Sequence, residues 1–508
     1  MSSDASMSEA RASRSRDAGV LVMGRVLATA SDALLPLVLV RLLDKTEVGV
    51  LGSVLLLYQT VAIVLATDLP TALMYYLPGR PSAERRAIAW QMAFGLLAFG
   101  ALAGLVLLAT GLLPSFAPQL SARLFSSEGP SLVRGGLEYL CLLAAFPLGD
   151  LPARMLPNLL VIENRSDAAA RFAVIKSVGN ALFVLVPAAL GMGMRSVILS
   201  YSLFGLIQGG VLVYFLRVLF TGTARVRTPV TFMTALRFAL PLGVTDVLAQ
   251  LNGRLDRYLI SATFTAAVFA EYHVGAFQIP ILGTIAYSVG TAYTPLFTEL
   301  IQAGKARQAI DAWRASIPKV ALVVVPFSMV FVIGAEEFVT ILFTKQYLHA
   351  AGVFRWYALM TLARAAAFGS VIVAAGKPQL VLRAALGALL ANGLFSGLGL
   401  WLFGFEGPAM GTALAIVPNI AVYCYYIGRA TGLPALSIYP LAAHAKIVLL
   451  GAVAALPALL VKQYVPLPAA LKLAAFAVLI LGGFCALGLA TRQLTRDDLR
   501  YARSWLRV

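Results

Sequence analysis

The chain has 508 residues, of which 60% are hydrophobic and only 12% are charged. A soluble core cannot bury that much apolar surface, so the composition indicates a polytopic membrane protein and excludes an ordinary soluble enzyme. The formal net charge of +17 is explained by basic loops at a membrane, which also favour contact with anionic lipid, rather than by nucleic-acid binding.

Apolar stretches of about 20 residues predict about fourteen membrane-spanning helices and an all-α polytopic fold. The predicted spans are 19–40, 50–77, 88–112, 136–161, 172–191, 196–216, 238–262, 268–298, 317–335, 353–375, 380–403, 407–427, 441–461 and 468–490. Lysine and arginine are most frequent in the loops and tails that share one side of the membrane with the N-terminus. This bias predicts that both termini are cytoplasmic.

The first two spans each carry acidic residues. The first has the basic start of a secretory signal, but Arg25 interrupts its apolar run and Asp32 follows seven residues later on the same helical face. We therefore expect an uncleaved first helix in which the two charges form a pair or face a cavity. In the second span, Asp68 precedes Leu69-Pro70, which predicts a break in the helix.

The fourth and fifth spans carry charges at helical spacing. Asp150 and Arg154 are four residues apart, which favours a structural ion pair, although the prolines of this span are compatible with an opened backbone near a cavity. Lys176 and Asn180 are one turn apart in the next span. For Lys176, the sequence leaves open whether the ammonium snorkels to the membrane surface or faces a polar cavity.

The segment 241–264 is a membrane-length span with many polar groups. It contains Asp246, Asn252, Arg254, Asp256 and Arg257. A charge at the centre of a spanning helix costs about 2.5 to 3.5 kcal/mol, so these groups require a polar interior rather than lipid. The arginines are either neutralised by the aspartates of the same span or available to an anionic ligand. The pattern favours transport.

Other polar residues are candidates for the same interior. Arg364 is isolated in an alanine-rich span, and Tyr287 belongs to a set of tyrosines that either contact sugar rings or anchor helices at the membrane interface. Asp32, Asp68 and Asp256 are the carboxylates that we expect to respond to a coupling proton or sodium ion, because the charge of a buried carboxylate depends on its ionic neighbours.

Catalysis, a metal site and a cofactor find no support in the sequence. The three cysteines and three histidines are widely separated. The Gly-Lys pairs at 304–305 and 376–377 lack the spacing and the Ser/Thr of a phosphate loop, and no Asp-x-Asp motif is present. We therefore expect a secondary transporter or lipid flippase, and a membrane glycosyltransferase or ligase is the less favoured alternative.

The segments after the first span and around the seventh have a recognisable pattern. Residues 41–52 read RLLDKTEVGVLG, residues 236–243 read LRFALPLG, and residues 251–260 read LNGRLDRYLI. With 272–280 and 295–300, they resemble the polysaccharide repeat-unit (O-antigen/exopolysaccharide) flippases of the multidrug/oligosaccharidyl-lipid/polysaccharide (MOP) exporter superfamily. The resemblance implies two pseudo-symmetric six-helix lobes around a central cavity, plus two C-terminal helices.

The resemblance also implies a division of the chain. The expected parts are a cytoplasmic N-terminal tail over 1–18, an N-lobe over 19–218, a cytoplasmic inter-lobe linker over 219–237, a C-lobe over 238–428, additional helices over 429–490 and a basic cytoplasmic tail over 491–508.

The cargo implied by the resemblance is an undecaprenyl-pyrophosphate-linked oligosaccharide, moved across the bacterial inner membrane by alternating access. Because guanidinium forks suit phosphate, Arg25 and Arg257 are the preferred pyrophosphate ligands, with Lys176, Arg254 and Arg364 as further cavity cations. The polar cavity and coupling candidates are Asp32, Asp68, Asp256, Asn252, Asn180 and Tyr287. Expected partners are membrane lipid, a polysaccharide polymerase and glycosyltransferases.

Two alternatives within the superfamily remain open. A lipid II flippase also has fourteen helices and a cationic cavity, and the sequence separates it poorly from a repeat-unit flippase. A multidrug/cation antiporter is less favoured, because sites for cationic drugs use acids and aromatic residues rather than buried cations.

Overall fold

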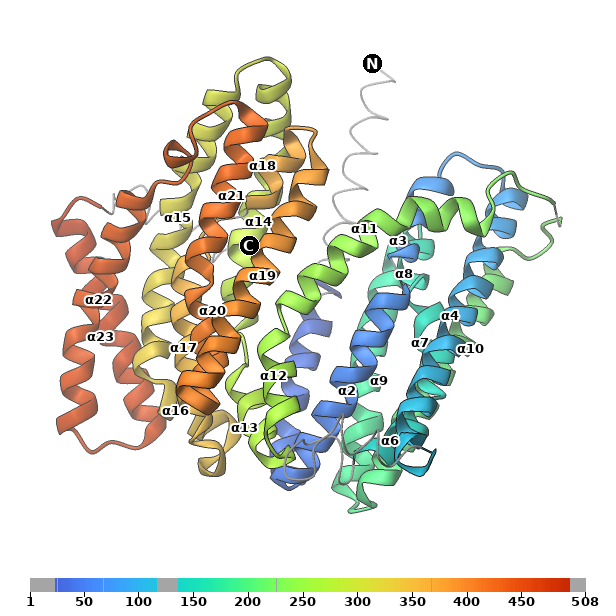
Figure 1. The fold of residues 1–508 in the computed structure, drawn as a ribbon, viewed down its shortest axis with the longest axis horizontal. Helices are drawn as coiled ribbons and strands as arrows, with labels where there is room; N and C mark the ends of the chain where they lie inside the picture. Colours follow the sequence, from blue (N-terminus) through green and yellow to red (C-terminus); the bar gives the residue numbers. More distant parts are fainter. Residues whose placement is uncertain are drawn as a thin grey trace. The chain divides into compact units, whose positions relative to one another are not determined.

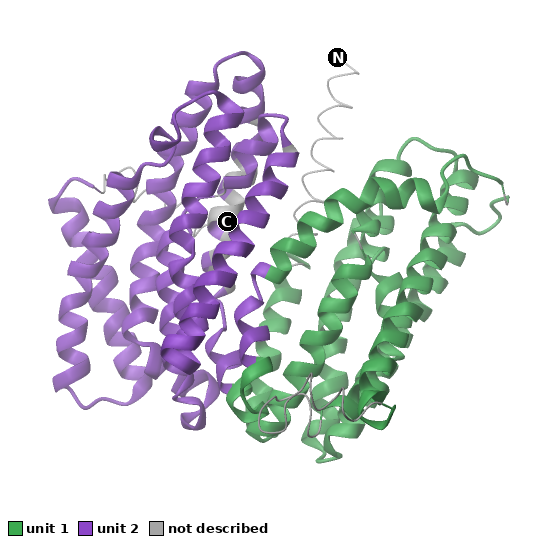
Figure 2. Cartoon of the chain, in the orientation of Figure 1, with its two compact units in different colours: residues 1–251, 261–270 green, residues 252–260, 271–508 purple. Residues whose placement is uncertain are grey.

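A computed structural model gives the fold of the chain (Figure 1). It describes residues 23–24, 26–66, 68–116, 136–224, 226–366 and 368–493, apart from the side chain of Pro378 and several side chains within 280–295. The chain forms two compact units (Figure 2). Unit 1 comprises residues 1–251 and 261–270, and unit 2 comprises residues 252–260 and 271–508. The two units are the parts of the chain that pack most closely within themselves. The predicted division at 219–237 is drawn from membrane topology instead, and it stays a prediction.

Unit 1 is a bundle of helices. Its elements are a helical segment over 26–42, α2 (Lys45–Ala66), α3 (Leu69–Tyr76), α4 (Ser82–Phe116), α6 (Leu137–Leu143), α7 (Phe146–Ala153), α8 (Leu156–Ile162), α9 (Ser166–Ala189), α10 (Gly193–Leu219) and nearly all of α11 (Phe232–Asn252). At the start of α2, the Glu47 amide donates to Asp44 Oδ1 at 2.8 Å and the Asp44 amide donates to Glu47 Oε2 at 3.1 Å. This capping box explains why the helix begins here.

Unit 2 is also built of helices, and its described residues contain no strand. Its elements include most of α12 (Leu255–Thr263), the second half of α13 (Ala266–Gly275), α14 (Pro280–Gln302), α15 (Ala306–Ile333), α16 (Ala335–Phe343), α17 (Ala350–Ala363), α18 (Phe368–Ala374), α19 (Pro378–Phe403), α20 (Gly407–Leu414), α21 (Ile416–Thr431), α22 (Leu441–Tyr464) and α23 (Ala469–Ala490). Short 3₁₀ turns occur at Lys345–Tyr347, Gly404–Glu406 and Ala435–Ser437. The predicted all-α fold is confirmed.

By length and composition, ten helical stretches of the described residues can cross a membrane, and a bent pair formed by α6 with α7 and α8 would make eleven. One of these stretches, Gln379–Thr431, is 53 residues long, far more than the roughly 20 residues that one crossing needs. It folds back on itself, because the backbone of Gly399 in α19 packs directly against that of Gly407 in α20. The count of fourteen spans stays a prediction.

Breaks within spans coincide with special backbone residues. Asp68 adopts a left-handed conformation with φ of 52° between α2 and α3, and its carboxylate accepts a hydrogen bond from Thr71 Oγ1 at 2.6 Å. A short polar side chain tolerates this conformation, and proline at the start of α3 fits a new helix. The fourth span is broken into α6, α7 and α8, with a bend of 57° after α6. The break predicted at Asp68 is therefore present.

Large apolar side chains cover much of the outer surface of both units. Trp401 of α19 is 81% exposed, Val478 of α23 is 73% exposed and Phe94 of α4 is 61% exposed. Exposed apolar surface on this scale is a liability in water, whereas lipid solvates it. The helices bond their own backbone groups, as a bilayer requires. The chain is a multi-pass membrane protein.

Close packing of α7 against α10 depends on glycine. A Cβ atom built on Gly149 would lie 1.8 Å from the carbonyl oxygen of Gly205. Because backbone atoms cannot move aside as a flexible side chain can, this position accepts no larger residue without separating the helices. Gly149 directly precedes Asp150, so the packing also positions that carboxylate.

We expect Gly149→Ala to lower the stability of unit 1 by about 1 to 3 kcal/mol through overpacking. The measurement is the apparent midpoint of thermal unfolding of purified protein in detergent. Gly210→Ala on α10 is the matched control, because a Cβ there meets nothing within 4 Å. Equal midpoints for the two variants would show that α7 and α10 separate at no cost.

Candidate functional site

A buried charge cluster in unit 1 centres on Asp150, which is 3% exposed. Arg154 Nη2, at the end of α7, lies 2.8 Å from Oδ2, and Lys176 Nζ, on α9, lies 2.8 Å from Oδ1. The Tyr58 hydroxyl of α2 also donates to Oδ2. Donors from three helices therefore occupy both carboxylate oxygens.

The cluster holds one more cation than anion. The predicted pair of Asp150 with Arg154 is confirmed, and Lys176 is its third charged member. Removing charges from water costs several kcal/mol per ion unless each finds a partner, so the carboxylate is needed to hold both cations. The Lys176 side chain keeps 25% of its surface exposed. The excess positive charge is therefore partly accessible from outside the cluster.

Polar contacts extend from the cluster along α9. Ser177 Oγ donates to the Asp32 carboxylate on the segment 26–42, and it also lies 2.8 Å from the Ala28 carbonyl oxygen. Asn180 Oδ1 accepts a long hydrogen bond of 3.5 Å from Gln208 Nε2 on α10. The predicted residues Lys176 and Asn180 therefore belong to a polar stretch of α9. This stretch contacts Asp32 on the segment 26–42 and Gln208 on α10.

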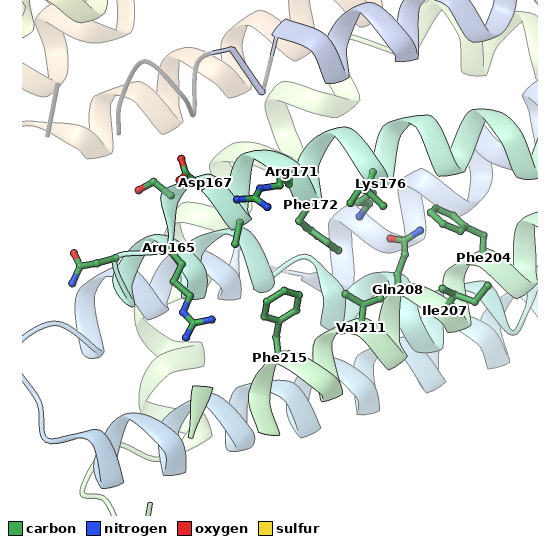
Figure 3. Close-up of a pocket in the computed structure, with 14 residues that line it drawn as sticks. Arg165, Asp167, Arg171, Phe172, Lys176, Phe204, Ile207, Gln208, Val211 and Phe215 are labelled. Carbon is green, nitrogen blue, oxygen red and sulfur yellow. The ribbon is translucent and has the colours of Figure 1, made fainter. Parts of the chain in front are cut away.

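An open cavity of about 640 Å³ lies between α9 and α10 (Figure 3). Arg165, Arg171 and Lys176 line it from the α9 side. Its α10 side is lined by Phe204, Ile207, Gln208, Val211 and Phe215. The cavity is therefore amphipathic, with cations along one helix and mainly apolar side chains along the other.

In unit 2, a second buried carboxylate is held by tyrosines. Asp256 is 1% exposed, and its Oδ2 accepts hydrogen bonds from Tyr272 on α13, at 2.9 Å, and from Tyr357 on α17. Neutral donors stabilise a buried anion without cancelling its charge. These two hydrogen bonds attach the Asp256 side chain to α13 and α17.

The Arg257 guanidinium is anchored by one hydrogen bond and has a further N–H group that donates to no described residue. Its Nη2 donates to the Ala276 carbonyl at 3.0 Å, immediately after α13. Its Nε is buried and has no hydrogen-bond partner within the described part of the chain. Arg254 lies three residues earlier, in the turn between α11 and α12. A buried donor without a partner is costly, which makes Arg257 a candidate ligand for an acceptor-rich anion.

A neutral polar cluster in unit 2 contains Asn252. Asn392 Nδ2, on α19, lies 2.9 Å from the Asn252 carbonyl oxygen and 3.0 Å from its Oδ1. Ser396 Oγ donates to Asn392 Oδ1 at 2.9 Å and lies 3.1 Å from Thr412 Oγ1 on α20. These side chains fix the end of α11 to the α19–α20 hairpin.

The remaining predicted residues are Arg364, Asp68, Arg25 and Tyr287. Arg364 follows α17 and donates from Nη1 to Gln278 Oε1 at 3.0 Å. Asp68 forms the helix break described above. Arg25 lies outside the described residues, and Tyr287 lies in α14 but its side chain is outside the described part. Of the described candidates, those of unit 1 are Asp32, Asp68, Lys176 and Asn180, and those of unit 2 are Asn252, Arg254, Asp256, Arg257 and Arg364.

Sequence reasoning missed Gln208, Tyr357, Asn392 and Ser396. Asn392 and Ser396 are four residues apart, a spacing that places them on one face of the predicted span 380–403. Gln208 lies within the apolar span 196–216. A search for amides and hydroxyls in spans, in addition to charges, would have found them. Within the residues searched, no group of three or more His, Cys, Asp or Glu is arranged to hold a metal ion.

A family model described as polysaccharide biosynthesis protein matches residues 143–352. No protein of curated function matches the sequence significantly. Among solved structures, the chain is similar to the lipid II flippase MurJ in an inward closed conformation, with a TM-score of 0.66, 14% identity, and coverage of 94% of this chain and 99% of that chain.

Two further similarities concern transporters. A MOP superfamily transporter from Pyrococcus furiosus gives a TM-score of 0.53 at 17% identity, covering 81% of this chain and 93% of that one. A MATE in complex with MaD5 gives 0.54 at 17% identity, covering 81% and 95%. At these identities, the neighbours show that the chain shares their fold. The family match therefore concerns the middle of the chain, residues 143–352, and the similarity to the solved structures concerns the fold.

Proposed function

We propose that the chain is a flippase for undecaprenyl-pyrophosphate-linked oligosaccharide repeat units in the synthesis of a bacterial polysaccharide such as O-antigen or exopolysaccharide. The observation that carries the proposal is the position of the family match. The matched residues 143–352 contain the three charged members of the Asp150 cluster of unit 1 and the segment 252–257 of unit 2. The candidate site and the match to polysaccharide biosynthesis thus fall on the same part of the chain.

The chemistry of the site suits such a cargo. A pyrophosphate requires cations and fixed donors, and guanidinium groups bind phosphate oxygens in a planar fork. Arg257 has a buried Nε without a partner among the described residues, and the Asp150 cluster has a positive charge in excess. The lipid tail of the cargo remains in the bilayer, so the protein needs to hold only the polar part.

The proposed setting is the bacterial inner membrane, with both termini in the cytoplasm. The basic tail and inner loops favour this orientation. Transport would proceed by alternating access of two lobes, driven by a proton or sodium ion or by the membrane potential. Asp32 and Asp256 are the acidic residues whose polar contacts make them candidates for the coupling step. A polymerase and glycosyltransferases would act on the cargo before and after transport.

A deletion strain tests the function. We expect polymer output to fall and undecaprenyl-linked units to accumulate on the cytoplasmic side, and the wild-type gene to restore both. The measurements are polymer yield and the sidedness of the lipid-linked intermediate in membrane vesicles.

Three other outcomes would contradict the proposal. Normal polymer with cell lysis and accumulated peptidoglycan precursor would instead indicate a lipid II flippase. Normal polymer with increased sensitivity to cationic drugs would indicate a drug exporter. Sugar transfer by the purified protein would indicate a glycosyltransferase.

A further inference from the structure

The cavity between α9 and α10 contains a buried polar atom that the protein itself does not satisfy. Gln208 is 2% exposed, and its Oε1 has no hydrogen-bond partner within the described residues. Its Nε2 makes only the 3.5 Å contact with Asn180. Figure 3 shows the side chain extending from α10 toward α9, beside Lys176. An amide oxygen buried without a donor is unfavourable, so it points to a missing O–H or N–H group.

The same cavity presents cations that are not used for folding. Arg165 and Arg171 form no ion pair within the described residues, and both side chains belong to exposed residues that line the cavity. Asp167 also lines it, so the two arginines leave one net positive charge at this end. The first turn of α9, a helix of 24 residues, begins here, and its free amides add positive potential. This end of the cavity favours an anion.

Apolar side chains line much of the rest of the cavity. Phe172, Phe204 and Phe215 line the cavity, and so does Ile207, which is 42% exposed. Apolar side chains next to a cationic end suit an amphipathic molecule with its chains in the bilayer. A soluble anion such as free phosphate has no part that would contact these side chains.

We propose that the α9–α10 cavity binds a lipid whose head group carries both a phosphate and hydroxyl groups. Arg165 and Arg171 hold the phosphate, Gln208 Oε1 accepts a hydroxyl hydrogen, and the phenylalanines contact the apolar part. Two sources have this chemistry: a membrane glycerophospholipid such as phosphatidylglycerol, and a polyprenyl-diphosphate-linked sugar. Only the second source rests on the proposed function, for which the cavity would then be a docking site of the cargo.

Lipid binding to the purified full-length chain tests the proposal. The probes are short-chain phosphatidylglycerol, short-chain phosphatidylcholine and a short-chain prenyl-diphosphate sugar, each titrated separately and counted by native mass spectrometry. We expect Arg171→Gln to weaken binding of the preferred probe roughly ten-fold, since a charge-assisted hydrogen bond is lost. Gln208→Met is expected to weaken it several-fold. Arg217→Gln, an exposed arginine near the same end of α10 and outside the cavity, is the control.

The outcomes separate the sources and the rival explanation. Preferential binding of phosphatidylglycerol that both cavity variants weaken supports a glycerophospholipid site, and it leaves the proposed function untouched. Preferential binding of the prenyl-diphosphate sugar with the same variant pattern supports a cargo site. Equal binding of phosphatidylcholine, or unchanged binding in both variants, would overturn the proposal. If Gln208→Met is more stable than the wild type and binds the probes unchanged, Gln208 is an unsatisfied amide that contacts no ligand.

Discussion

Replacing Asp150 by asparagine is expected to destabilise the chain by about 3 kcal/mol, because it leaves two cations without their shared anion. Arg154 and Lys176 both lie 2.8 Å from this carboxylate, and their side chains are only 29% and 25% exposed. The expected result is a lower apparent midpoint of thermal unfolding in detergent and lower membrane abundance. Tyr58→Phe removes one hydrogen bond to the same group and should cost about 1 kcal/mol.

Lys176→Met is the informative companion of this substitution. It removes one cation and leaves the pair of Asp150 with Arg154 intact, so its effect on unfolding should be small. The double variant Asp150→Asn, Lys176→Met should recover part of the stability lost in Asp150→Asn, because fewer charges are left unpaired. An Asp150→Asn variant as stable as the wild type would mean that another group compensates the cations.

The sequence predicted those features of the fold that depend on neighbours along the chain. Hydropathy located the helical regions, because a lipid-facing helix must be apolar over its whole length. The pair of Asp150 with Arg154 follows from a spacing of four residues on one helix. The break at Asp68 follows from the proline two residues later. In each case the cause lies within a few residues.

Spacing along the chain does not predict contacts between helices. Lys176 is 26 residues from Asp150 and Tyr58 is 92 residues away, yet both contact its carboxylate. For Asp256, the sequence left open a pairing with the arginines of its own span, and it gave no sign of Tyr272 and Tyr357, which both bond its Oδ2. Which helix faces which is set by packing, such as the glycine contact of α7 with α10, and a single sequence does not encode that directly.

The polar contacts inside the two units have a parallel arrangement. In unit 1, Asp32 on the first predicted span meets Ser177 on the fifth. In unit 2, Asn252 on the seventh meets Asn392 on the eleventh, the positions expected for a repeat of six spans. The two connections differ in charge, one containing a carboxylate and the other only neutral groups.

Arg257→Ala is expected to lower polymer output per molecule roughly ten-fold or more at equal membrane abundance, since the lost charge-assisted hydrogen bonds to a pyrophosphate are strong. Arg257→Lys keeps the charge but not the fork and should retain part of the output. The measurement is polymer yield in the complemented deletion strain, normalised to protein in the membrane. Arg307→Ala is the control, because its pair with Asp311 has both side chains more than half exposed.

The alternative role for Arg257 is an anchor for the chain after α13, through its bond to the Ala276 carbonyl. An anchor predicts a lower unfolding midpoint in Arg257→Ala, with normal output for each folded molecule, and rescue by any residue that restores the bond. A cargo ligand predicts the reverse, with loss of output at an unchanged midpoint. The buried Nε favours the second result, because an anchor that used the guanidinium fully would leave no donor without a partner among the described residues.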